Sequence, residues 1–352
     1  MKDKLITLLK IAISLGLMAY LFYRFLSDPA DRAVLVETLT TANYAWLLLA
    51  LLLFEAAIVV NAVKWYVLLR AQGVPVPLIA LTNYTFVGFF FNNFLPANVG
   101  GDVMRGFGVA RYTERNADAA VSVVVDRIIG LMGYMVSAVV AALIVVRIVS
   151  ETGQLGGVPA SPALVENLTQ VEIVAVLGTL FIVGVFAMML SDRLRELIGR
   201  LFDIKFLKPL APIYRQLSNA FGAYRTQYRA LFQAFLLGVA NIVLTSLVDI
   251  AIVAGLHGTI PPLYIFLFNP IIAVVLIAPI SIGGLGTMSV LYVYFYGLVG
   301  VPATLAFALS LVKQLVIYVG SLPGGVLWLR SREAVKQQAE RRRDDAEAGN
   351  AF

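Results

Sequence analysis

The sequence contains no cysteine and little charge, and each shortage excludes a class of protein. With no cysteine among 352 residues, disulfide frameworks and thiolate chemistry are excluded. The single histidine, His257, cannot build a metal site that needs several histidines. Charged residues make up only 14% of the chain, whereas a soluble domain averages about 25%. Hydrophobic residues reach 60%, and this composition predicts a polytopic membrane protein.

Long apolar runs define the expected architecture. Six runs are long enough to cross a bilayer, which takes about 20 apolar residues. Two further runs, 78–95 and 263–299, contain or end at proline and glycine, and we expect re-entrant or broken helices there. The predicted fold class is an all-α polytopic membrane protein with about six transmembrane helices plus two broken segments. The expected spans are 5–26, 45–69, 121–146, 171–190, 231–256 and 303–328.

The two broken segments carry the same short motif. Residues 96–101 and 279–284 both read Pro-x-x-x-Gly-Gly, 183 residues apart. Breaks at corresponding positions of two halves indicate a transporter's binding site within an inverted repeat. The alternative is that two Pro/Gly breaks coincide by chance. The expected division is a transmembrane domain at 1–330, with repeat halves at about 45–146 and 231–328, followed by a charged cytoplasmic tail at 331–352.

Basic residues predict the orientation of the chain. If both broken segments enter and leave the membrane on one side, six spans place both termini on the same side. Most Lys and Arg residues then fall in inner segments, as the positive-inside rule requires. We therefore expect a multi-pass protein of a bacterial-type inner membrane with both termini in the cytoplasm. The net charge of +6 reflects this orientation, and no nucleic-acid partner is expected.

The first motif leads into a segment that suits an anionic ligand. Gly100 and Gly101 permit a tight turn, and Asp102 can cap the helix that follows. The start of that helix offers N–H groups and a partial positive charge. Arg105, one turn later, has the planar fork that matches a phosphate. The segment predicts a lipid-phosphate site, with an ordinary loop-to-helix junction as the alternative.

Ionisable residues inside apolar spans are costly and mark candidate functional positions. Glu55 lies near the middle of its span, where it could take part in proton coupling. Asp249 and Lys313 lie deep in the second half, either as a charge relay or as an ion pair with each other. Asp126 and Arg127 open the third span, where snorkelling to the interface is the alternative to a role in the site. Lys64 is the remaining residue of this kind.

The order of these residues resembles a known family. The first signature has Asn, Pro, Gly-Gly-Asp and Arg, then an acid–arginine pair at the next span; here it is Asn93, Pro96, Gly100, Gly101, Asp102, Arg105, Asp126 and Arg127. The second signature is Pro279, Gly283, Gly284 and Gly286, with Ser289 where Glu is usual. This pattern is similar to the lysylphosphatidylglycerol synthase transmembrane-region family of flippase-like proteins, to which the flippase half of the multiple peptide resistance factor belongs.

The resemblance covers about residues 1–330 and implies translocation or handling of a lipid. It also implies that the residues of both signatures bind the substrate. Ser289 in place of the usual Glu puts an acidic role there in doubt and suggests a different headgroup. The aminoacyl-transferring domain of full-length synthases is not found in this sequence, so the resemblance is to the stand-alone branch of the family.

We therefore expect an integral membrane lipid translocase that moves a phosphate-bearing lipid or lipid-linked intermediate between leaflets. Asp102 or Asp249 is expected to meet a cationic headgroup. The alternatives are a membrane-embedded transferase acting on polyprenyl or glycero-lipids, and a non-transporting partner of a lipid synthase. No P-loop, zinc-protease or serine-hydrolase motif occurs, so no enzyme activity, catalytic residue, metal or cofactor is predicted. The expected partners are a membrane lipid and a separate lipid-synthesising enzyme, and an oligomer is compatible with the sequence.

Overall fold

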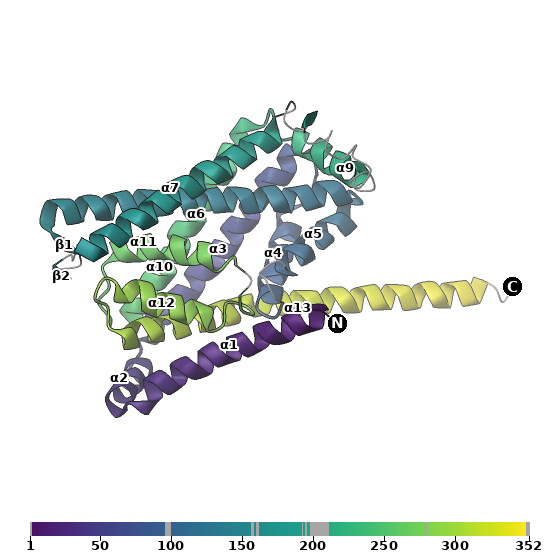
Figure 1. Cartoon of the computed structure of the whole chain (residues 1–352). Coiled ribbons are helices and arrows are strands. Elements are labelled where there is room, and N and C mark those ends of the chain that lie inside the picture. Colours follow the sequence, from purple (N-terminus) through teal and green to yellow (C-terminus); the bar gives the residue numbers. More distant parts are fainter. Residues whose placement is uncertain are drawn as a thin grey trace.

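The computed structural model describes residues 2–95, 100–155, 158–159, 162–191, 193, 196–197, 211–278 and 280–349, nearly all of them in helices (Figure 1). The first half contains α1 (Lys2–Ser27), α2 (Pro29–Thr40), α3 (Tyr44–Ala71), α4 (Leu78–Asn92), α5 (Gly100–Thr113) and α6 (Asn116–Thr152). Two short antiparallel strands follow, β1 (Gln154–Leu155) and β2 (Val158–Pro159). The rest of the chain contains α7 (Pro162–Leu190), α9 (Ala211–Gly222), α10 (Tyr228–Gly255), α11 (Pro262–Val275), α12 (Thr287–Gly297) and α13 (Ala303–Gly349).

The helices confirm the predicted fold class, an all-α polytopic membrane protein. In the described part of the chain, five helices are long and apolar enough to cross a membrane: α1, α3, α6, α10 and α13. The apolar helix α7, with 29 residues, takes the place of the expected fourth span. α4 and α11, with 15 and 14 residues, reach only about 21–23 Å at 1.5 Å per residue and are too short to cross.

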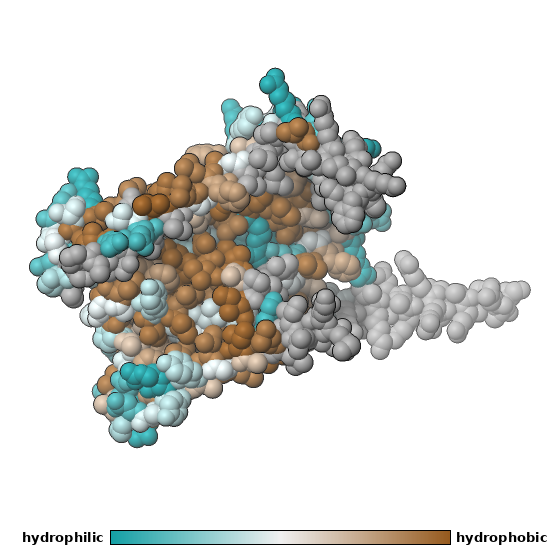
Figure 2. Space-filling model, in the orientation of Figure 1, coloured by the Kyte–Doolittle hydropathy of each residue, from teal (hydrophilic) through white to brown (hydrophobic). Residues whose placement is uncertain are grey.

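Figure 2 shows the surface that follows from this composition. Hydrophobic side chains cover a broad face of the helical body, and hydrophilic ones gather at its margins, among them α2. Exposed Leu48, Leu52, Leu143 and Leu236 lie on the membrane-spanning helices α3, α6 and α10. Such an apolar exterior suits hydrocarbon and not water as the surrounding solvent.

One helix and two helix boundaries differ from the sequence prediction. α2 was not expected; it begins at Pro29, and the Asp28 side chain caps it by accepting from the Ala30 N–H (2.8 Å). α6 begins at residue 116 instead of 121, so the end of the polar segment before the third span belongs to the first turn of α6. α13 continues as one helix through residue 330 to Gly349, because Glu, Lys, Arg, Gln and Ala are strong helix formers. The division into domains at residue 330 stays a prediction.

Two sets of four helices repeat the same order of lengths. In each set a long helix is followed by two short ones and then by another long one. The first set is α3, α4, α5 and α6, and the second is α10, α11, α12 and α13. The packing repeats as well: α13 lies against α4 of the first set, and α11 lies against α6 in the corresponding position. α3 and α10, the first helix of each set, pack against each other. This exchange of corresponding helices is what two-fold pseudosymmetry produces.

The pairing of α3 with α10 gives the direction of the pseudosymmetry axis. The Asn43 N–H donates to the Gly255 carbonyl (2.8 Å), and Asn241 Nδ2 donates to the Ala57 carbonyl (2.7 Å). Contacts that advance along α3 therefore move backwards along α10, so the two helices are antiparallel. Equivalent membrane-crossing helices that run antiparallel are related by an axis in the membrane plane, as in an inverted repeat.

Candidate functional site

A cavity of about 310 Å³ lies between the two sets of helices. Its wall contains residues of α3, α4, α5 and α6 from the first set and of α10, α11, α12 and α13 from the second. Asn92 and Asn93 at the end of α4 share this wall with Gly283 and Gly284 of the turn before α12. The two motif-bearing segments, which lie far apart in the sequence, therefore border one space.

The two broken segments touch each other at this wall. A Cβ placed on Gly283 would lie 2.8 Å from the Asn93 carbonyl oxygen, and Gly283 has φ +57°. Both the close approach and the left-handed backbone require glycine at this position. Asn93 Nδ2 donates to Ser321 Oγ of α13 (2.7 Å), and the Gly101 N–H donates to Asn92 Oδ1 (2.9 Å). The two amides therefore hold the end of α4 against its neighbours.

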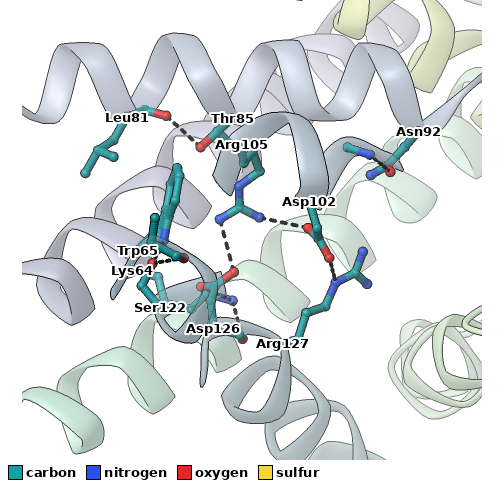
Figure 3. A network of polar contacts seen from close by, with 12 residues as sticks. Lys64, Trp65, Leu81, Thr85, Asn92, Asp102, Arg105, Ser122, Asp126 and Arg127 are labelled. Carbon is teal, nitrogen blue, oxygen red and sulfur yellow. Dashed lines mark hydrogen bonds and ion pairs between the residues drawn. The ribbon is translucent and has the colours of Figure 1, made fainter. Parts of the chain in front are cut away.

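A network of buried charges forms one side of the cavity (Figure 3). Lys64 Nζ on α3 lies 3.1 Å from Asp126 Oδ1 on α6. Arg105 on α5 reaches Asp126 Oδ2 with Nη2 (3.1 Å) and Asp102 Oδ1 with Nη1 (3.4 Å). The side chains of Lys64, Arg105 and Asp126 are 8%, 6% and 3% exposed. Three helices are therefore joined by charge pairs away from water, where each pair interacts strongly.

Arg127 and Trp65 complete this network. Arg127 Nε donates to Asp102 Oδ2, and the Arg127 side chain remains 38% exposed at the cavity wall. The Arg105 guanidinium lies over the Trp65 ring, 4.4 Å from its centre, in a cation–π contact. Trp65 Nε1 in turn donates to Ser122 Oγ of α6 (3.0 Å). Arg105 is thus held by two carboxylates and an aromatic face, whereas Arg127 is more accessible.

This geometry bears on two interpretations of the sequence. Both Nη atoms of Arg105, which was expected to hold a phosphate with its two-pronged fork, meet carboxylates of the protein. Asp126, the eleventh residue of α6, is buried between Lys64 and Arg105, which does not fit the alternative that its side chain snorkels to the interface. Sequence reasoning marked Lys64 only as a charged residue in a span, and it gave no signal for the role of Trp65.

A second polar centre lies in the other half. Lys313 Nζ on α13 is 2.8 Å from Asp249 Oδ1 on α10, so these two residues form an ion pair. Tyr292 on α12 donates its hydroxyl to Asp249 Oδ2 (2.9 Å), and Lys313 donates to Asn269 Oδ1 (3.1 Å). Lys313 and Tyr292 border a smaller pocket of about 140 Å³, which shares Phe54 and other wall residues with the main cavity.

The two centres occupy equivalent positions with their charges exchanged. Asp126 and Lys313 are the eleventh residues of α6 and α13, and Arg105 and Tyr292 are the sixth residues of α5 and α12. Lys64 and Asp249 are the twenty-first and twenty-second residues of α3 and α10. Each half therefore joins its first and last helix by one buried ion pair, but the lysine and the aspartate change places.

The remaining predicted site residues that the structure describes lie outside the cavity wall. Gly100, Gly101 and Gly286 do not line it; a Cβ on Gly286 would lie 2.8 Å from Leu17 Cβ of α1, so this glycine serves packing. Glu55 is half-buried on α3, close to α13, and is not in the wall. Two prolines of the motifs lie outside the described residues, namely Pro96 and Pro279.

Comparison with known proteins confirms the resemblance seen in the sequence. The family described as "Lysylphosphatidylglycerol synthase TM region" matches residues 7–324 of this chain. A UPF0104 membrane protein of Pyrococcus horikoshii is 25% identical, over 85% of this chain and 90% of the relative. The match covers both sets of four helices, and so both polar centres.

Proposed function

Because this chain belongs to the lysylphosphatidylglycerol synthase TM region family, we propose that it is a lipid translocase of a bacterial-type inner membrane, with both termini in the cytoplasm. It moves a phosphate-bearing lipid or lipid-linked intermediate between the leaflets. The headgroup passes through the cavity between the two helix sets, and the lipid tails stay in the membrane.

The observation that carries this proposal is the mixed character of the cavity. One side holds three cations, Lys64, Arg105 and Arg127, against two carboxylates, Asp102 and Asp126. The excess of positive charge attracts a phosphate. The other side is apolar, with Phe54, Ile58, Ile242, Leu276 and Ile317. A lipid presents the same two chemistries, because its phosphate is joined directly to an apolar body.

The inverted arrangement of the helices supports movement between leaflets. In transporters of this kind, substrate sites lie where the two repeats meet, and one repeat rocks against the other to expose the site to each side in turn. The cavity lies at such a junction, and it is bordered by turns with helix-breaking glycines. We propose that Gly283 and Asn93 meet at the point where the two halves move.

Transport by purified protein in lipid vesicles tests the proposal. Labelled lipids in a panel of headgroups are followed by a reagent that reaches only the outer leaflet. Ala273→Trp fills the cavity, because Ala273 lies in its wall, and should slow lipid movement at least tenfold. The matched control Ala56→Trp lies on an exposed face of α3 and should leave the rate unchanged.

The same experiment separates the alternatives. If no lipid in the panel moves faster than in protein-free vesicles, the translocase proposal is wrong. Chemical conversion of a polyprenyl or glycero-lipid would then favour a membrane-embedded transferase. Copurification with a lipid-synthesising enzyme, without activity of the chain alone, would favour a non-transporting partner.

A further inference from the structure

We propose that the cavity selects an anionic lipid whose headgroup carries no positive charge, and that Arg127 is the residue that contacts its phosphate. This inference rests on the proposed function and names the substrate class of the same cavity. The proposed function names only a phosphate-bearing lipid, whose headgroup can be anionic, zwitterionic or cationic. The present inference concerns this charge.

The charges of the main cavity do not cancel. Its wall, as far as the described residues form it, holds three cations and two carboxylates: Lys64, Arg105, Arg127, Asp102 and Asp126. One positive charge is therefore left over, which matches one phosphate diester with its single negative charge. At membrane depth such an excess is costly unless an anion compensates for it.

The carboxylates of the wall are already committed to cations of the protein. Asp126 lies between Lys64 and Arg105, and Asp102 lies between Arg105 and Arg127. An ammonium group of a lipid headgroup would have to displace one of these partners. It would also stand beside like charges, which disfavour it. The expectation that Asp102 meets a cationic headgroup therefore does not fit this arrangement.

Of the described residues that line the cavity and the pocket beside it, those of the second half include no carboxylate for an ammonium group either. Asp249 is fully buried, and it is paired with Lys313 and bonded by Tyr292. Ser289 is 2% exposed and accepts a hydrogen bond from Ser310 Oγ (2.8 Å), so its position is neutral. The second centre is electrically balanced, and the charge excess of the cavity wall comes from the first half.

Accessibility identifies the cation that reaches the lipid. The Arg127 side chain is 38% exposed, against 6% for Arg105 and 8% for Lys64. The two buried cations hold the carboxylates of the network in place. Arg127 lies at the wall, on the side of Asp102 away from Arg105 (Figure 3), and can turn its guanidinium toward a phosphate that enters the cavity.

Binding of defined lipids to the purified protein in uncharged detergent tests this selectivity. The probes are phosphatidylglycerol and a polyprenyl phosphate (anionic), phosphatidylethanolamine (zwitterionic) and lysylphosphatidylglycerol (cationic). We expect at least tenfold tighter binding of an anionic probe than of the zwitterionic or cationic one. The two anionic probes distinguish a glycerolipid from a polyprenyl substrate.

Variants of Arg127 separate contact from packing. Arg127→Gln should weaken binding of the anionic probe about tenfold and, because it releases Asp102, strengthen binding of the cationic probe. Arg127→Lys should restore part of the anionic affinity. Arg147→Gln is the matched control, since Arg147 is an exposed arginine of the same helix, 81% accessible, beyond the cavity. It should leave every affinity unchanged.

Two results would overturn the inference. One is that the zwitterionic or cationic lipid binds as tightly as the anionic ones. The other is that Arg127→Gln weakens the binding of all probes equally, which would mean that Arg127 has a structural role. If the anionic preference holds but vesicle assays detect no lipid movement, the translocase proposal fails and this binding assignment stands. If the vesicles transport the cationic lipid alone, the translocase proposal stands and this binding assignment fails.

Discussion

Asp126 offers the sharpest test of the buried network, because one carboxylate balances two cations. Its oxygens lie 3.1 Å from Lys64 Nζ and 3.1 Å from Arg105 Nη2, and its side chain is 3% exposed. Asp126→Asn keeps the shape of the side chain and removes the charge. Removing one partner of a buried pair costs about 3–5 kcal/mol, since the other charge stays buried without compensation. That cost corresponds to roughly a hundredfold to a few thousandfold change in the folding equilibrium.

A substitution of Lys64 tests whether Lys64 and Asp126 stabilise the protein as a pair. Lys64→Met alone leaves Asp126 with Arg105 and should also destabilise the protein. In the double variant Lys64→Met/Asp126→Asn the buried lysine charge is gone, so its cost should fall short of the sum of the two single costs. Residues in one ion-pair network typically show such coupling of about 0.5–3 kcal/mol.

Unfolding by a denaturing detergent, followed by tryptophan fluorescence, measures these costs. Trp65 lies against Arg105 inside the network and reports its loss directly, once Trp46 and Trp328 are replaced by Phe. Glu151→Gln is the control, because the Arg147–Glu151 pair has a similar N–O distance (2.9 Å) but its side chains are 81% and 62% exposed. Exposed pairs contribute about 0–1 kcal/mol. Equal costs for Asp126→Asn and Glu151→Gln, or additive costs in the double variant, would refute the reasoning.

Two further predictions concern the turn before α12 and the orientation of the chain. Gly283→Ala should destabilise the protein more than Gly284→Ala. The new Cβ at Gly283 would lie 2.8 Å from the Asn93 carbonyl oxygen, and the backbone there has φ +57°. At Gly284, with φ +73° and the nearest contact at 3.6 Å, alanine should cause backbone strain alone. Thermal unfolding in detergent measures the order, and a Gly283→Ala protein as stable as Gly284→Ala would contradict it. Glu114→Cys and Gln154→Cys flank α6 in a chain without cysteine; on intact cells an impermeant thiol reagent should label only Gln154→Cys, and labelling of Glu114→Cys instead would reverse the predicted orientation.

Much of the fold was predictable because the bilayer limits the choice of structures. A span of about 20 apolar residues must be helical, since lipid offers its backbone no hydrogen-bond partner. The sequence therefore located α3 and α10 to within about three residues of the observed ends. α2 was missed because it is short and half polar, so neither length nor hydropathy distinguishes it from a loop. Its cap, Asp28 followed by Pro29, was the available signal.

The site was less predictable because its partners come from distant parts of the chain. The signatures marked Asp102, Arg105, Asp126 and Arg127 individually. Which cation lies beside which carboxylate depends on how α3, α5 and α6 pack, and no local pattern contains that information. The phosphate role expected of Arg105 was based on the planar shape of its guanidinium. The structure shows that carboxylates occupy this group, so only the packing could identify Arg127 as the accessible cation.

The exchange of signs between the halves explains how a symmetric scaffold holds an asymmetric site. In each half one ion pair joins the first and last helices, Lys64–Asp126 in one and Asp249–Lys313 in the other. The pair holds the helices together whichever of the two carries the lysine. The equivalent position on the third helix decides the chemistry: it is Arg105 in one half and Tyr292 in the other. A tyrosine adds a hydrogen bond to Asp249 without adding charge, so that half stays balanced. On the proposed mechanism, a transported phosphate would therefore be held by the first half whichever side of the membrane the cavity faces, and the second half would move against it.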